Sequence, residues 1–254
     1  MSALVTVTKA GPLLRLELNR PDELNALSFP LLAELRDAFA AHAHSSEIRA
    51  MVLSGAGRAF SAGADLRVMP ADINVEQALA ELYNPIVHTI ATLNKPVVAL
   101  IDGVVAGAGL SLALACDLRI GTARSQYVAG FHGIGLTLDA GMSWFLPRLL
   151  GSARAAELTL LNKTINAEEA RHIGLISELV NTREDAEPLL AALAAGPTQA
   201  FARTKQELRA SWGNTLEQQL ALEATLQQEA SETADFAEGL RAFAERRTPN
   251  FGGK

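Results

Sequence analysis

Short apolar runs alternate with amphipathic helical stretches through the first part of the chain. Residues 4–19 contain two β-rich runs joined at a Gly-Pro pair, which predicts a β-hairpin. Residues 28–42 begin with a serine and predict a capped helix. Residues 50–55 and 96–101 are continuous apolar runs typical of buried strands, and an amphipathic helix is expected between them over residues 75–93. This alternation predicts an α/β core.

A glycine-rich segment opens the next helix. Residues 102–117, with the sequence DGVVAGAGLSLALACD, lead into a short helix that is apolar on every face and must therefore be buried all round. Two short strands are expected after it, at residues 118–122 and 126–130.

From Asp139 onward the pattern is almost entirely helical. Helices are expected over residues 140–151, 152–162 and 166–174, the last ended by a glycine, and a short strand over residues 175–180. Further helices run to about Arg247, with breaks at Gly196-Pro197 and Gly213-Asn214. We therefore expect two parts, a core at residues 1–195 and a helical appendage or oligomer contact at residues 196–254.

Composition and charge narrow the class of protein. Of the 254 residues 49% are hydrophobic, enough for a sizeable core, and the net charge of −6 with no Lys/Arg run argues against a general nucleic-acid binder. The single cysteine, Cys116, excludes an internal disulfide and suits a reducing compartment. The N-terminus lacks the pattern of a signal peptide and no apolar stretch reaches the length of a membrane span, so we expect a cytoplasmic protein without a membrane partner.

Several familiar chemistries fit the sequence poorly. The segment GAGLSL at residues 107–112 begins like a dinucleotide-binding loop, but its third small residue is replaced and no acidic residue follows at the required distance. Ser111, Asp139 and His172 occur in the order of an α/β-hydrolase triad, yet the serine lies ten residues beyond its strand rather than in a sharp turn. His42 and His44 are more simply a solvated helix end than metal ligands, and no metal site is expected.

Two Gly/Ala segments offer a better candidate. AFSAGADL and VVAGAGLSL each follow a predicted strand, where α/β sheets bind ligands. Small side chains allow a substrate to approach the backbone, and the helix that opens in the second segment presents free N–H groups. Two such donors aimed at one oxygen form an oxyanion hole. On these segments alone, tight loop packing remains the alternative.

Five segments together resemble the crotonase (enoyl-CoA hydratase/isomerase) superfamily in order and spacing: LNRPDELNAL, GAGRAFSAGADL, KPVVALIDGVVAGAGLSLALACDLRIGT, GLTLDAGMSWFLPRLLG and AEEARHIGLISELV. The resemblance covers roughly residues 4–254. It implies the crotonase (ClpP-like) fold, with repeated ββα units and a helical C-terminal trimerisation region. It also implies an acyl-CoA thioester substrate, in which coenzyme A is part of the substrate and no separate cofactor is required, and a homotrimer or dimer of trimers.

The resemblance also assigns residues. The oxyanion donors fall on the backbone N–H groups of Ala64 and Ala108. Phosphate contacts from a neighbouring subunit are implied for Arg247 or Lys254. Contacts with the acyl group or with coenzyme A are implied for Ala26, Ala62, Asp65, Leu66, Gly107, Ser111 and Phe131.

Departures from the family pattern bear on the reaction. The two glutamates of typical hydratases fall on Ser111 and Phe131, neither of which transfers protons as a carboxylate does. Asp139 falls where isomerases of the superfamily keep an acidic residue, and its segment most resembles the ring-1,2-epoxyphenylacetyl-CoA isomerases of phenylacetate breakdown. We therefore expect an acyl-CoA isomerase with Asp139 as the proton shuttle. A hydratase with different catalytic residues, and a non-catalytic acyl-CoA binder in which Asp139 only caps a helix at Ala140, are the alternatives.

Overall fold

Two sheets organise the chain in the computed structural model, which describes residues 3–70 and 72–254. The larger sheet has the strand order β1-β2-β3-β5-β7-β10, with β1 antiparallel to β2 and the other neighbours parallel. The smaller sheet has the order β4-β6-β8-β9, and only β9 is antiparallel to its neighbour. The strands are β1 (Val5–Ala10), β2 (Leu13–Leu18), β3 (Ala50–Gly55), β4 (Ala59–Ser61), β5 (Val97–Ile101), β6 (Val104–Ala106), β7 (Leu118–Thr122), β8 (Gln126–Val128), β9 (Thr164–Asn166) and β10 (Glu178–Val180).

Successive strands enter the two sheets in turn. The pairs β3-β4, β5-β6 and β7-β8 each place their first strand in the larger sheet and their second in the smaller sheet, and helices follow each pair. The expected crotonase-type architecture of repeated ββα units is therefore confirmed. The expected hairpin at residues 4–19 is confirmed as β1-β2, and its turn contains Gly11 at a φ of 58°.

The helices are α1 (Phe29–His42), α2 (Val75–Ala78), α3 (Asn84–Thr92), α4 (Gly107–Ala115), α5 (Met142–Leu150), α6 (Ser152–Leu160), α7 (Ala167–His172), α8 (Glu187–Ala195), α9 (Thr198–Ala210), α10 (Leu216–Ser231) and α11 (Ala234–Glu245). Ser28 caps α1 as expected, because its Oγ accepts a hydrogen bond from the N–H of Leu31. The helix expected over residues 75–93 forms, but a π-helical turn at Leu79–Tyr83 joins α2 to α3.

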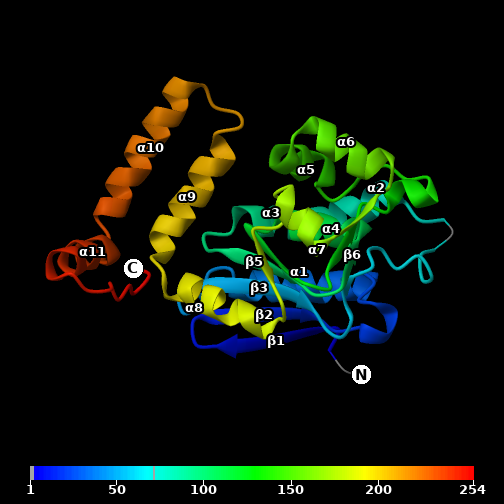
Figure 1. The fold of residues 1–254 in the computed structure, drawn as a ribbon, viewed down its shortest axis with the longest axis horizontal. Helices are drawn as coiled ribbons and strands as arrows, with labels where there is room; N and C mark the ends of the chain where they lie inside the picture. The colour runs from blue at the N-terminus through cyan, green and yellow to red at the C-terminus, as the bar shows by residue number, and fades with distance from the viewer. Residues whose placement is uncertain (1–2, 71) are drawn as a thin grey trace.

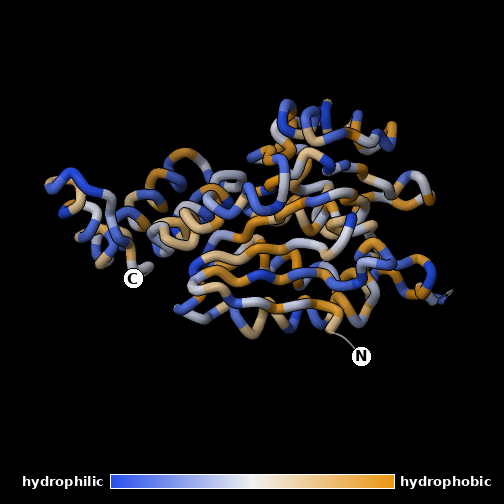
Figure 2. Tube along the Cα trace, turned by 60° about the horizontal axis from the view of Figure 1, so that its bottom comes forward, coloured by the Kyte–Doolittle hydropathy of each residue, from blue (hydrophilic) through white to orange (hydrophobic). Residues whose placement is uncertain are grey.

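The central strands β3 and β5 of the larger sheet are buried on both faces, as strands of parallel sheets usually are. Along β3, Ala50 and Val52 belong to a small core under α8, whereas Met51 and Leu53 belong to the main core on the opposite face. Hydrophobic positions accordingly follow the central strands, while the C-terminal helices carry mixed polar and apolar positions (Figure 2).

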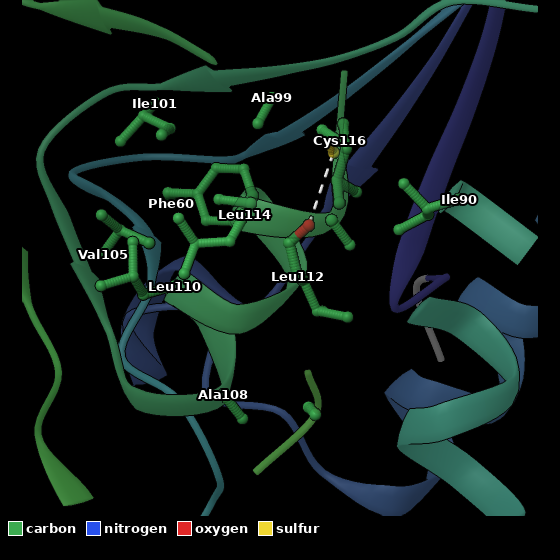
Figure 3. Close-up of a cluster of buried hydrophobic side chains, with 14 of the residues drawn as sticks. Phe60, Ile90, Ala99, Ile101, Val105, Ala108, Leu110, Leu112, Leu114 and Cys116 are labelled. Carbon is green, nitrogen blue, oxygen red and sulfur yellow. Dashed lines mark hydrogen bonds between the residues drawn. The ribbon is translucent and has the colours of Figure 1, made fainter. Parts of the chain in front are cut away.

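Helix α4 lies inside the main core. All of its residues from Ala108 to Ala115 are buried, which explains why the sequence shows no polar face there. Leu110, Leu112 and Leu114 point into surrounding apolar side chains, and Cys116 beyond the helix is buried with them (Figure 3). Burial on every side fixes the position of the first turn of α4, which bears on the site described below.

Helices α9, α10 and α11 form an arm that projects from the body of the molecule, with α9 and α10 side by side (Figure 1). An ion pair attaches α9 to the body: Lys205 Nζ lies 2.7 Å from Asp117 Oδ2. Within the described residues, none of the helices has the length and apolar character that crossing a bilayer requires. Large apolar side chains of the arm are nevertheless exposed, namely Leu208, Trp212, Leu216, Leu220, Phe236, Leu240 and Phe243.

Candidate active site

The two Gly/Ala segments singled out in the sequence lie against each other. They follow β4 and β6, which are parallel neighbours in the smaller sheet. Gly63 and Gly107 have φ values of 89° and 53°, a region in which glycine is far less strained than other residues. A Cβ on Gly63 would lie only 3.0 Å from the carbonyl oxygen of Ala106, and one on Gly107 would lie 3.7 Å from the Cα of Gly63. Glycine at position 63 thus permits the close approach of the two chains.

The backbone N–H groups of Ala64 and Ala108, the two expected oxyanion donors, point away from the main-chain hydrogen bonds that adjacent residues form. Leu27 forms a parallel bridge with Ala64 through the carbonyl of Gly63 and the N–H of Asp65. Alternation along an extended segment therefore turns the N–H of Ala64 to the opposite side. Ala108 is the second residue of α4, where N–H groups have no acceptor within the helix.

These two residues open onto one cavity of about 270 Å³, which we call the inner cavity. Its wall is mostly apolar, and Asp139 and Tyr83 supply the polar side chains among the described residues that line it. Gly107 and Phe131, for which substrate contacts are predicted, also line this cavity. The remaining lining residues are Phe29, Ala62, Gly63, Leu66, Met69, Ile73, Val75, Ala78, Leu79, Ala106, Gly130, Ile134 and Leu136.

Asp139 presents a poorly solvated carboxylate to this cavity. Its Oδ1 is buried and has no hydrogen-bond partner within the described part of the chain. Burial raises the pKa of the Asp139 carboxyl from its usual value to about 6. A raised pKa makes the ionised carboxylate a stronger base than an exposed aspartate, and the group remains largely ionised at neutral pH.

The backbone around Asp139 explains how its side chain is held. Ala140 has a φ of 47° and Gly141 a φ of 85°, so the chain turns sharply before α5. The carbonyl oxygen of Asp139 accepts hydrogen bonds from Met142 N and from Ser111 Oγ, both at 3.0 Å. A non-glycine residue in this left-handed region stores strain of the kind often found at functional sites.

The alternative that Asp139 caps a helix is wrong. Helix α5 begins at Met142 rather than Ala140, its N-cap position is Gly141, and no side chain caps it. The two extra residues form the left-handed turn, which directs the carboxylate into the cavity instead of toward the first turn of the helix.

Ser111 lies outside the inner cavity. It is fully buried on α4 and its hydroxyl contacts main-chain oxygens, those of Asp139 at 3.0 Å and Gly107 at 3.4 Å. Because this hydroxyl does not contact the Asp139 carboxylate, and His172 is exposed at the end of α7, the hydrolase triad does not form. Ser111 instead connects the helix that carries Ala108 to the turn that carries Asp139.

A second hollow adjoins the inner cavity at Ala62, Ala64 and Leu66. This outer depression has a volume of about 320 Å³. It is lined by the four residues predicted to lie around coenzyme A, namely Ala26, Ala62, Asp65 and Leu66. Its lining residues are Asp22, Glu23, Leu24, Ala26, Arg58, Ala62, Ala64, Asp65, Leu66 and Arg67.

The carboxylate of Asp65 forms ion pairs with two arginines. Arg20 Nη1 lies 2.9 Å from its Oδ2, and Arg67 Nε lies 3.4 Å from its Oδ1. Burial alone would raise the pKa of Asp65, but these arginines outweigh it and hold the pKa below its usual value. Asp65 therefore anchors the loop after Ala64, and it is a much weaker base than Asp139.

Sequence reasoning missed three side chains at these hollows. Arg58 and Arg67 place positive charge in the outer depression, and Tyr83 lines the inner cavity. Tyr83 falls within a helical pattern, where an aromatic residue is expected to belong to the core, so its position gave no signal. Arg58 lies inside the segment GAGRAFSAGADL and Arg67 directly follows it. Two basic residues so close to a predicted ligand-binding loop are a signal that the sequence does contain.

The basic residues expected near phosphates from a neighbouring subunit lie on the arm and in the tail that follows it. Arg247 Nη1 lies 2.6 Å from Glu238 Oε1, and the carbonyl oxygen of Lys254 accepts a hydrogen bond from Asp235 N. The structure contains one chain, so their approach to a neighbour stays a prediction. No group of three or more histidine, cysteine or acidic residues placed to hold a metal ion occurs within residues 3–70 and 72–254.

Comparison with known proteins agrees with the fold and the motifs. The family described as enoyl-CoA hydratase/isomerase matches residues 8–254. The chain is 43% identical to a probable enoyl-CoA hydratase of Rhodobacter capsulatus, over 93% of both chains. It is 38% identical to the 1,2-epoxyphenylacetyl-CoA isomerase of Escherichia coli, over 94% of both chains.

A solved structure supports the same assignment. The crystal structure of a putative enoyl-CoA hydratase/isomerase from Mycobacterium abscessus superposes with a TM-score of 0.92 at 35% identity, covering 98% of this chain and 100% of the other. With a family match over nearly the whole chain and relatives above 30% identity, the protein belongs to the enoyl-CoA hydratase/isomerase family, whose members act on acyl-CoA thioesters.

Proposed function

We propose that the protein is an acyl-CoA isomerase in which Asp139 moves a proton along the acyl chain. The observation that carries this proposal is the content of the inner cavity: two outward-facing backbone N–H groups and, among the described residues, a single carboxylate. One base that accepts a proton and returns it is sufficient for moving a double bond.

Proton removal from the acyl chain places negative charge on the thioester oxygen. The N–H groups of Ala64 and Ala108 would hold this oxygen, and each such donor contributes roughly 100- to 1,000-fold in rate. The apolar wall excludes water, which strengthens both hydrogen bonds. The step is an isomerisation without net redox change, so it requires no redox cofactor, and the two N–H groups would stabilise the charge for which a metal ion would otherwise be needed.

Asp139 is suited to both halves of the transfer. Its carboxylate accepts a proton from the α- or γ-carbon, and the resulting acid, with a pKa near 6, can return it at the other carbon. The buried and unpartnered Oδ1 leaves the carboxyl free to turn toward either carbon.

Hydration is the chemistry that must be distinguished from isomerisation, because both appear among the relatives' names. Hydration in this family is expected to require two glutamates, at the positions of Ser111 and Phe131. Ser111 lies outside the inner cavity and Phe131 has no proton to transfer, so the described lining residues include no second carboxylate to activate water.

We expect the purified protein to isomerise 3-enoyl-CoA thioesters but to hydrate crotonyl-CoA slowly. The experiment follows formation and loss of the 2-enoyl chromophore with a panel of enoyl-CoA and ring-epoxide thioesters. Hydration at or above a typical enzyme's ~10 per second would contradict the proposed chemistry. Binding of the thioesters without any turnover would instead identify a non-catalytic acyl-CoA binder.

We also propose that the arm is an assembly surface and that the protein is a trimer or a dimer of trimers. Its exposed apolar residues have no covering element within the described chain, and such faces are usually buried between subunits. Multi-angle light scattering at micromolar concentration is expected to give about three or six times the chain mass of 26.9 kDa. A particle with the mass of one chain would rule the assembly out.

A further inference from the structure

Tyr83 is a second polar side chain in the inner cavity, and the proposed proton transfer does not use it. It ends the π-helical turn between α2 and α3, and only 4% of the residue is exposed. π-Helical turns frequently occur at functional sites. Its ring also forms part of a side cavity of about 270 Å³, which shares Phe29, Met69 and Tyr83 with the inner cavity. Tyr83 therefore stands in the wall between the two cavities.

The hydroxyl of Tyr83 is poorly paired. Its hydrogen bond to the carbonyl oxygen of Leu27 measures 3.5 Å, beyond the 2.5–3.0 Å usual for an O–H donor. That carbonyl already accepts a bond from Asp65 N at 3.2 Å. The Tyr83 hydroxyl could therefore donate to a closer acceptor in the cavity, and giving up its long bond to Leu27 would cost little.

Tyr83 keeps its hydroxyl hydrogen and so remains a hydrogen-bond donor. Burial, together with the negative charges of Asp139 and Asp65, raises the pKa of its phenol above the usual value. The group therefore stays protonated across the working pH range and cannot act as a base. An acyl chain without oxygen beyond the thioester carbonyl would leave this buried donor with its long bond to Leu27, whereas a further oxygen on the chain would satisfy it.

We propose that Tyr83 is a specificity-determining residue whose hydroxyl donates a hydrogen bond to an oxygen atom on the acyl chain beyond the thioester carbonyl. The site would then favour acyl-CoA thioesters bearing a hydroxyl, ether or carbonyl oxygen over the corresponding hydrocarbon thioesters. The inference rests on the proposed function only in placing the acyl group in the inner cavity.

Binding of unreactive thioesters tests the inference separately from catalysis. Calorimetry would compare hexanoyl-CoA with its 3- and 6-hydroxy derivatives, which do not close to five- or six-membered lactones, on the wild-type protein and on Tyr83→Phe. At least one hydroxylated thioester is expected to bind the wild type about tenfold more tightly than hexanoyl-CoA. In Tyr83→Phe this advantage should disappear while the affinity for hexanoyl-CoA changes less than about threefold.

Met69→Leu is the matched control, because Met69 shares the same wall, has no donor and is replaced at nearly constant volume. It should change the affinities for hydroxylated and plain thioesters by the same factor. The inference is overturned if no hydroxylated thioester binds more tightly, or if Tyr83→Phe weakens both kinds equally, as a purely structural tyrosine would. Because these thioesters contain no double bond, a protein that shows the selectivity but isomerises nothing would refute the proposed reaction and leave the role of Tyr83 intact.

Discussion

Asp139→Asn is expected to lower the rate of isomerisation by about 1,000-fold, within the range that general acid–base groups contribute. Asparagine has nearly the same shape but cannot accept the proton. The fold should persist, since Oδ1 has no partner to lose and the carboxylate caps no helix. Removing a buried charge should leave the thermal midpoint equal to that of the wild type or higher. Steady-state assays, thermal denaturation and thioester binding measure the three properties separately.

The pH profile supplies the control for this variant. The Asp139 carboxyl acts only when ionised, so the wild-type rate should fall as the pH decreases through about 6, its pKa in the folded protein. The residual rate of Asp139→Asn should lack this acidic limb. Activity within tenfold of the wild type, or an unchanged limb in the variant, would show that another group moves the proton.

Sequence patterns predicted the larger sheet well, because its central strands are apolar runs with clear boundaries. The strands of the smaller sheet were largely missed. Ala59–Ser61 and Val104–Ala106 are three residues long and adjoin glycine-rich turns, so neither shows a period of two or a continuous apolar run. Their pairing is decided by contacts between distant segments, which local patterns do not contain.

The candidate site was predicted in outline and incompletely in detail. Ala64, Ala108 and Asp139 meet at one cavity, as the motifs implied. The roles of Ser111 and Tyr83 depend on tertiary contacts: the serine hydroxyl is directed to the carbonyl of Asp139, and the tyrosine reaches the cavity through a π-helical turn. Sequence patterns do not show which acceptor a serine hydroxyl will bind, and they do not show where a helix will widen into a π-helical turn.

The left-handed turn at Ala140 illustrates the same limit. An acidic residue before an apolar helix is typical of a cap, which is why a cap at Ala140 stood as the alternative to the proton shuttle that the family resemblance implies for Asp139. Alanine gives no local sign that it will adopt a positive φ. Ser111 and Met142 both donate hydrogen bonds to the Asp139 carbonyl and help to stabilise this backbone. The conformation that exposes the Asp139 carboxylate to the cavity therefore depends on Ser111, 28 positions away in the sequence, as well as on the nearby Met142.

Ala108→Pro is expected to lower the isomerisation rate by about 100- to 1,000-fold, the usual effect of losing one oxyanion donor. Proline removes the N–H that would hold the thioester oxygen and places its ring where that hydrogen points. Ala108 is the second residue of α4, and proline is tolerated in the first turn of a helix because its N–H has no partner there. The buried remainder of α4 should therefore keep its place in the core (Figure 3).

Ala108→Gly is the matched control, because it changes the side chain at the same position and keeps the N–H. Its rate should stay within a few-fold of the wild type, with a modest loss of stability from the glycine in a helix. Comparing kcat, KM and the thermal midpoint of the two variants separates the effect of losing the N–H donor from the effect of changing the side chain. If Ala108→Pro were folded and its kcat within tenfold of that of Ala108→Gly, the N–H of Ala108 would not stabilise the enolate. The proposed oxyanion hole would then have to be built from Ala64 and a different partner.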